Sequence, residues 1–63
     1  MKRYISKSNP ELEFFVEKTF QNSYMVVSQV EGYDATEAHD DWFFNKQDAE
    51  EIAQQLANES WHL

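Results

Sequence analysis

The densest group of side chains able to do chemistry is a run of carboxylates with one imidazole in the second half of the chain. It comprises Glu31, Asp34, Glu37, His39, Asp40 and Asp41. Carboxylate oxygens are the ligands that Ca²⁺ and Mg²⁺ prefer, and an imidazole nitrogen suits transition metals. The run lacks the glycine and the regular Asp or Asn alternation of an EF-hand loop. The pattern therefore favours a solvated acidic loop, with no metal and no cofactor.

Catalysis by these or other groups is not indicated. General acid–base catalysis needs a carboxylate or histidine with a shifted pKa in a dry cleft, which a 63-residue domain rarely encloses. Ser28, Ser60, His39 and His62 fit no nucleophile motif, and a single glycine excludes a glycine-rich phosphate loop. We therefore expect no catalytic residues and no enzymatic activity.

Charge is divided unevenly along the chain. Residues 1–30 hold four cations and three carboxylates, whereas residues 31–63 hold nine carboxylates and Lys46 as their one cation. Such a concentration of like charge opposes compaction and favours a cationic partner. It also disfavours phosphate contacts. We expect a basic protein as partner and no direct binding of nucleic acid.

Size and composition indicate one small domain spanning residues 1–63. The chain has no cysteine, which excludes disulfides and fits a reducing compartment. No apolar run is long enough for a secretory signal or a membrane span, so a cytoplasmic protein without membrane contact is expected. Ten aromatic residues among 63 argue against disorder.

The C-terminal part of the chain has the pattern of an amphipathic helix, expected at 46–59. Asn45 is a suitable N-cap, and the Asp48 carboxylate falls where backbone N–H groups lack partners. Phe44 could close over Ala49 as a hydrophobic staple. Apolar residues then recur at helical spacing; they are Ala49, Ile52, Ala53, Leu56 and Ala57.

The rest of the chain predicts strands. Residues 24–30 are β-branched or aromatic and largely apolar on both faces, which indicates a central strand. Residues 2–7 fit a charged edge strand, and residues 42–44 a short strand that leads into the helix. An acidic connector is expected at 31–41.

Residues 10–21 are compatible with a helix or with a strand. Asn9 and Pro10 are typical of a helix start, whereas the run Phe14, Phe15 and Val16 favours a pleated strand. In the connector, Asp34 and Glu37 could cap a short helical turn. The predicted fold is α+β: a small antiparallel β-sheet of three to four strands, with one C-terminal helix packed on a face.

The aromatic residues exceed what one sheet face and one helix stripe of this size can cover. Those expected in the core are Phe14, Phe20, Tyr24, Trp42, Phe44 and Trp61. Phe15, Tyr33 and Phe43 alternate away from these neighbours and are predicted to be exposed anchors of an interface.

Two hypotheses for function follow. The first is a small acidic, non-enzymatic interaction module that inhibits or modulates a partner by binding its basic surface. Its predicted binding residues are Glu31, Asp34, Glu37, Asp40, Asp41, Glu50, Glu51 and Glu59. Helix stability does not explain Glu59, because the helix dipole disfavours an anion in the last turn.

In size and charge the chain is similar to small acidic inhibitors encoded by phages and mobile elements, including nucleic-acid mimics. No motif identifies a family. The alternative hypothesis is a structural homodimer, or an accessory subunit, that associates through exposed aromatic residues.

Overall fold

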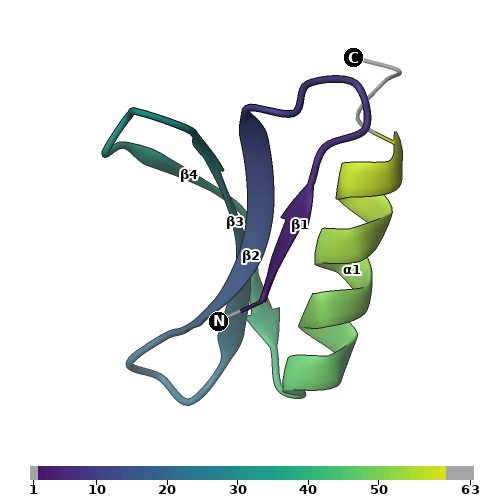
Figure 1. The fold of residues 1–63 in the computed structure, drawn as a ribbon. Helices are drawn as coiled ribbons and strands as arrows, with labels where there is room; N and C mark the ends of the chain where they lie inside the picture. The colour runs from purple at the N-terminus through teal and green to yellow at the C-terminus, as the bar shows by residue number, and fades with distance from the viewer. Residues whose placement is uncertain (1, 60–63) are drawn as a thin grey trace.

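A four-stranded antiparallel sheet with one helix across a face forms the structure, a computed structural model that describes residues 2–59 and, for residues 40–42, the backbone alone (Figure 1). The elements are β1 (Arg3–Ile5), β2 (Leu12–Lys18), β3 (Tyr24–Val30), β4 (Thr36–Phe43) and α1 (Lys46–Glu59). The predicted α+β class is confirmed, as are the bounds of the helix. Ser60, Trp61 and His62 lie outside the described residues.

The strands follow one another in the sheet in the order β1-β2-β3-β4, so β1 is an edge strand and β3 a central one, as predicted. Residues 12–18 form a strand because β2 pairs along its whole length with β3, from Leu12 opposite Val30 to Lys18 opposite Tyr24. Long-range pairing thus overrides the helix-start signals at Asn9 and Pro10.

A five-residue turn, 19–23, joins β2 to β3. Thr19 and Ser23 close it through a hydroxyl contact of 2.7 Å and a backbone hydrogen bond of 2.8 Å from Thr19 N to Ser23 O. Asn22 adopts a left-handed conformation with φ 62°, which asparagine tolerates better than most residues.

The prediction for residues 31–41 is wrong in part, because β4 begins at Thr36 instead of residue 42. No helical turn forms at Asp34 and Glu37. The physical reason is the open edge of β3, whose backbone groups gain partners from this segment whatever its side chains are. Two shifts of register between β3 and β4 accommodate a sequence without regular alternation.

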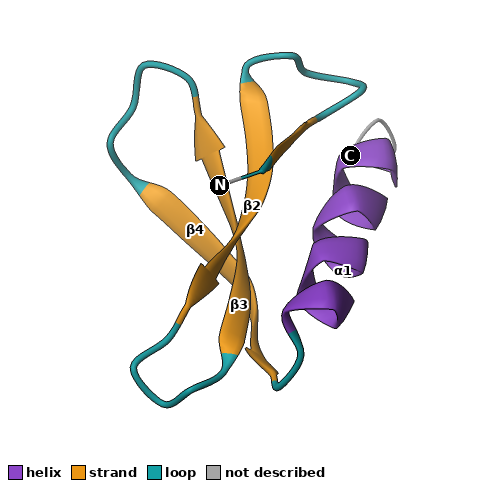
Figure 2. Ribbon diagram, turned by 60° about the horizontal axis from the view of Figure 1, so that its bottom comes forward, coloured by secondary structure: helices purple, strands orange, loops and turns teal. Residues whose placement is uncertain are grey.

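The main core lies between α1 and the central strands. Phe14, Val16 and Val26 pack against a buried stripe of alanines on the helix, Ala49, Ala53 and Ala57. Because alanine side chains are short, α1 approaches β2 and β3 closely, and β4 diverges from it (Figure 2). This leaves most of β4 without helix cover.

The opposite face of the sheet is also buried at its centre, which corrects the prediction for Phe15. Its side chain is only 2% exposed and is not available as an interface anchor. The Arg3 guanidinium lies over the ring, 4.2 Å from its centroid, and the neighbouring Val27 is equally buried. A long cationic side chain can thus cover an apolar surface while its charged head stays wet. Phe43 is half-buried against the main core.

Two aromatic residues expected in the core are exposed instead. Phe20 is 95% exposed in the β2–β3 turn, beyond the point where strand pairing ends. Phe44 is 86% exposed between β4 and α1, so the predicted staple onto Ala49 does not form. Phe14 and Tyr24 do contribute to the core, and the side chain of Trp42 lies outside the described part.

The alanine stripe yields a test of the packing. Replacing the fully buried Ala53 by Leu should lower the free energy of unfolding by about 1–3 kcal/mol, because an enlarged side chain forces α1 away from the sheet. Urea denaturation measures the change. The neighbouring Gln54→Leu is the control on the exposed side of the helix and should alter stability by less than about 0.5 kcal/mol. Equal effects of the two substitutions would contradict this account.

Candidate functional site

One end of the molecule gathers carboxylates from three segments that are distant in sequence. Backbone hydrogen bonds tie these segments together: Glu31 N donates to Glu11 O at 2.7 Å, and Lys7 N donates to Ala57 O at 3.1 Å. The β1–β2 loop therefore lies beside both the β3–β4 loop and the last turn of α1 (Figure 1). We call this region the acidic end, defined by the exposed side chains of Glu11, Glu31, Asp34, Glu37 and Glu59, with Lys7 as its cation.

Among the described side chains, no ion pair neutralises a carboxylate of the acidic end. Its five carboxylates and one lysine sum to −4, more than half of the chain's net charge of −7. Among the side chains that the structure describes, the one ion pair joins Arg3 Nη1 to Glu13 Oε2 at 2.8 Å, outside this region. The polar contact of Glu59 is with a neutral group, Gln55 Nε2, at 3.3 Å. The carboxylates therefore give this end of the fold a net negative potential.

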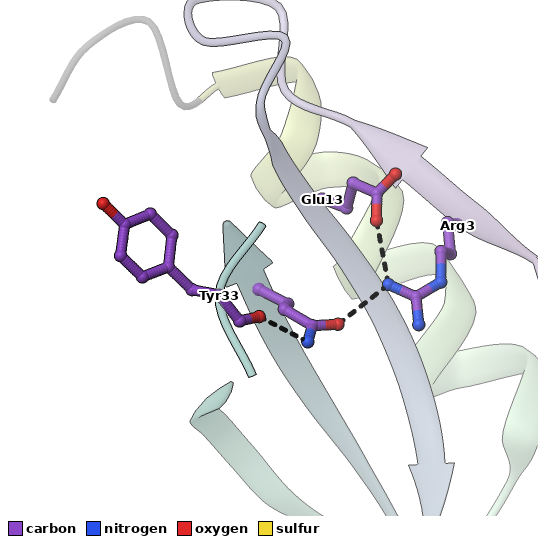
Figure 3. Close-up of polar contacts among 4 residues, drawn as sticks. Arg3, Glu13 and Tyr33 are labelled. Carbon is purple, nitrogen blue, oxygen red and sulfur yellow. Dashed lines mark hydrogen bonds and ion pairs between the residues drawn. The ribbon is translucent and has the colours of Figure 1, made fainter. Parts of the chain in front are cut away.

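A polar network across the sheet positions the β3–β4 loop at this end. Besides its ion pair with Glu13, Arg3 Nη1 donates to Gln29 Oε1 at 3.1 Å. Gln29 Nε2 in turn donates to the Tyr33 carbonyl at 2.9 Å. Figure 3 shows this chain of contacts, with the ring of Tyr33 directed away from the sheet. The network fixes the loop backbone beside Asp34 and leaves Tyr33 68% exposed.

The acidic residues predicted from the sequence are only partly brought together. Glu31, Asp34 and Glu37 lie on one side of the β1–β2 loop at the acidic end and Glu59 lies on the other, and Glu51 is exposed on α1. Asp40 and Asp41 follow on β4, and their side chains lie outside the described part. Glu11 was missed because its place depends on the pairing of β1 with β2, which a charge pattern does not reveal.

Glu50 belongs to a different environment from the other predicted acidic residues. At the far end of α1, a hollow of about 590 Å³ is lined by Lys2, Lys18, Lys46, Glu17, Glu50, Val16 and Tyr24. We call this region the lysine end. Three of the chain's five cations surround the hollow. Because Glu17 and Glu50 line the hollow as well, its three lysines and two carboxylates sum to +1, in contrast to −4 at the acidic end.

The floor of the hollow contains an unusual carboxylate. One oxygen of Glu50, Oε1, is buried and has no hydrogen-bond partner among the described residues. Burial raises the pKa of nearby Tyr4, and the hydrogen bonding and negative charge of Glu50 raise it further. The ammonium of Lys2, the residue before β1, lies 5.3 Å from the centroid of the Tyr4 ring.

A serine and a histidine meet on the helix-facing side of the sheet. The distance from His39 Nε2 to Ser28 Oγ is 2.8 Å, and the imidazole lies 5.5 Å from the ring centroid of Phe14. Irregular pairing of β4 with Val26 and Val27 brings His39 to this position. Because Ser28 is only 6% exposed, its hydroxyl is not accessible to a substrate carbonyl. The contact satisfies a buried hydroxyl beside the core.

Comparison of the chain with protein-family models, with curated proteins and with solved structures found no match. Within the described residues, no group of three or more His, Asp or Glu side chains is arranged to hold a metal ion. The helix of this same part of the chain is too short and too polar to cross a membrane.

The contact between Tyr4 and Glu50 predicts a loss of stability in alkali. A tyrosine whose folded-state pKa is raised above the ordinary 10.0 favours folding while it is protonated. This contribution is complete below pH 10.0 and decreases as the pH rises through the folded-state pKa. Thermal unfolding between about pH 8 and about pH 12, roughly two units either side of the ordinary value, should therefore show a fall in Tm that is shallower in Tyr4→Phe. Tyr33→Phe, on an exposed side chain, is the matched control, and an identical fall in all three proteins would contradict the assignment.

Proposed function

We propose that this protein is a small acidic interaction module that binds a basic surface of a partner protein through its acidic end and thereby inhibits or modulates that partner. The observation that carries the proposal is the presence of five exposed carboxylates from three segments at one end of the fold, with one lysine beside them and no ion pair to any of the five among the described side chains. A field of one sign raises the rate of encounter with a basic partner and fixes its orientation. Surfaces that bind nucleic acid are the most basic partners of this kind, so we propose a nucleic-acid mimic as the mode of action.

The acidic end is suited to binding because it is organised before the partner arrives. Backbone hydrogen bonds join its three segments, and the contacts of Gln29 with Arg3 and with the Tyr33 carbonyl hold the loop. Preorganised groups lose less conformational entropy on association. The exposed ring of Tyr33 adds an apolar anchor among the charges, a residue type enriched where binding energy concentrates. We place this interaction in the cytoplasm, in keeping with a cysteine-free chain.

Neutralising the acidic end tests the proposal. The triple variant Glu31→Gln, Asp34→Asn and Glu37→Gln removes three exposed charges and changes no described ion pair. Proteins retained by the immobilised wild-type chain at low salt, and released at high salt, should bind this variant at least about tenfold more weakly, or about 1.4 kcal/mol. Affinity is measured by calorimetry on each purified partner, and displacement of duplex DNA from that partner tests the mimicry.

A second triple variant controls for net charge. Glu17→Gln, Asp48→Asn and Glu51→Gln also raise the net charge by three, but at positions outside the acidic end. This variant should bind the partner with an affinity within about threefold of the wild type, because rim charges far from a contact contribute little. Equal weakening by the two variants would show that only the total charge matters and would overturn the proposed site.

Self-association is a second candidate function, favoured by the exposure of Phe20 and Phe44. Both lie at the lysine end, one in the β2–β3 turn and one between β4 and α1. Aromatic side chains left almost wholly in water are typical of an interface. Their pairing between two copies would leave the acidic end free to bind.

Replacement of both phenylalanines by serine tests this candidate. The wild-type chain should form dimers, with a Tm that rises with protein concentration, and Phe20→Ser with Phe44→Ser should abolish both properties. Light scattering at several concentrations measures the mass. Tyr33→Ser, at the other end of the molecule, is the control and should remain dimeric. A wild-type chain that stays monomeric at millimolar concentration would exclude this candidate and leave the acidic end untouched.

A further inference from the structure

We propose that the outer edge of β4 binds an extended segment of the partner protein, rich in lysine or arginine, which adds to the sheet as a further strand. β4 (Thr36–Phe43) is the last strand in the order β1-β2-β3-β4, so β3 pairs with one of its edges and, among the described residues, no strand lies along the other. Strand addition to an open sheet edge is a recurrent mode of peptide recognition. The inference rests on the proposed function, because it specifies the form in which a basic partner meets this chain.

The two edges of the sheet differ in their protection. β1 has 3 residues and lies beside α1 (Figure 1), and the Lys7 N–H shortly after it donates to Ala57 O at 3.1 Å. β4 has 8 residues and diverges from α1 (Figure 2). Residues 36–39 of this strand are all exposed. Short strands and covering elements are common means of closing an edge, and within the described part of the chain β4 has neither.

The backbone of β4 supplies the donors and acceptors for a further ladder. In an antiparallel pair, the N–H and C=O groups of alternate residues point toward the partner strand, and those of the residues between them point away. The backbone groups of residues 36–39 take part in none of the described hydrogen bonds outside the β3–β4 ladder. The side-chain contact of His39, 2.8 Å from Nε2 to Ser28 Oγ, runs back into the sheet. The outward backbone groups are therefore accessible to an extended chain.

The charge of β4 selects the occupant of this edge. The strand contains Glu37, Asp40 and Asp41 and no lysine or arginine. Across a pair of strands, opposite charges stabilise the pairing and like charges destabilise it. A second copy of β4 would bring three more carboxylates to the same pair of strands, whereas a basic segment would neutralise the three already present. We therefore assign the edge to a basic segment of another protein and not to a second copy of this chain.

The start of the β4 edge adjoins the acidic end and is held in place. Thr36 lies opposite Gln29 in the ladder. The Gln29 side chain accepts from Arg3 Nη1 and donates to the Tyr33 carbonyl, which fixes this part of the sheet. Glu37, the next residue of β4, belongs to the acidic end. A segment attracted there can continue along β4, and a fixed edge loses little conformational entropy on pairing.

Titration of the ¹⁵N-labelled full chain with a capped peptide that alternates lysine with threonine tests the inference. The peptide has 8 residues, the length of β4. The amide resonances of residues 36–39 should shift in a saturable way. Alternate amides of β4 should also exchange more slowly with solvent in the complex, because the new ladder protects the donors that point outward.

Two further peptides separate the backbone from the charge. A peptide of equal length that alternates lysine with proline has the same charge but cannot form a ladder, so it should bind at least about tenfold more weakly. A peptide that alternates glutamine with threonine can form a ladder but lacks the charge, and it should also bind at least about tenfold more weakly.

The outcomes distinguish this inference from the function on which it rests. Equal affinity for the two lysine peptides would overturn strand pairing and leave the acidic end as the binding surface, because both peptides carry the same charge. Absence of saturable shifts with the lysine–threonine peptide would also overturn strand pairing, whereas the proposed function is decided separately by the retained partner proteins and the two triple variants. Shifts of the β4 amides that grow with protein concentration, without peptide, would assign the edge to a second copy and overturn the inference.

A matched pair of single variants locates the peptide on the chain. Glu37→Gln, on β4, should weaken the lysine–threonine peptide by about twofold to fivefold, the range for one cross-strand charge pair. Glu51→Gln removes an equal charge from the exposed side of α1 and should leave the affinity unchanged. Equal effects of the two variants would place the peptide elsewhere and overturn the inference. Unchanged amide spectra away from each substitution verify that both variants fold.

Discussion

The contact between the alanine stripe of α1 and the centres of β2 and β3 determines the rest of the structure. A 63-residue chain has one helix with which to cover a four-stranded sheet, and small domains bury a low fraction of their surface. Ala49, Ala53 and Ala57 are buried and bring the helix close to the central strands. A helix seated this closely cannot also cover β4. The second face is closed instead by Arg3 over the ring of Phe15, with no second layer.

Two charged residues at the ends of α1, Lys46 and Glu59, are placed where the helix dipole disfavours them. Lys46 stands at the positive end of the dipole and Glu59 at the negative end, and the last turn has no basic residue. Each unfavourable placement costs about 0.3–1 kcal/mol at low ionic strength. Asp48 in the first turn and the Asn45 cap, which accepts from Gln47 N at 2.8 Å, offset part of this cost. Helix stability therefore does not account for Lys46 and Glu59.

The elements were predictable from the sequence where local pattern and tertiary pairing agree. The helix at 46–59 has a cap and an apolar stripe, and residues 24–30 are apolar on both faces because β3 is central. The prediction failed for β4, since residues 36–41 are polar and gain their strand conformation from the edge of β3. It failed for Phe15 and Phe20 for a related reason. Whether an aromatic side chain is covered depends on the neighbour across the sheet, such as Arg3, and on where pairing ends.

The sign of the charge on the candidate surfaces could be predicted from the sequence, but the position of these surfaces on the fold could not. A count of charges finds the acidic excess, yet the segments that form the acidic end are joined by backbone contacts such as that of Glu31 with Glu11. Glu50 and Glu51 are neighbours in the sequence, but successive residues on a helix point about 100° apart. One therefore faces Tyr4 and the lysines, and the other faces solvent. The different surroundings of Glu50 and Glu51 are therefore set by how α1 packs on the sheet.

Distance keeps the two ends electrically independent. The fourteen residues of α1 span about 21 Å at 1.5 Å per residue, which places Glu59 far from Lys46. The Debye length at physiological ionic strength is about 8 Å, so the field of one end is largely screened at the other. Near 0.01 M salt the Debye length is about 30 Å, and the two ends would influence each other there. The salt concentration thus determines whether the electrostatic fields of the two ends overlap.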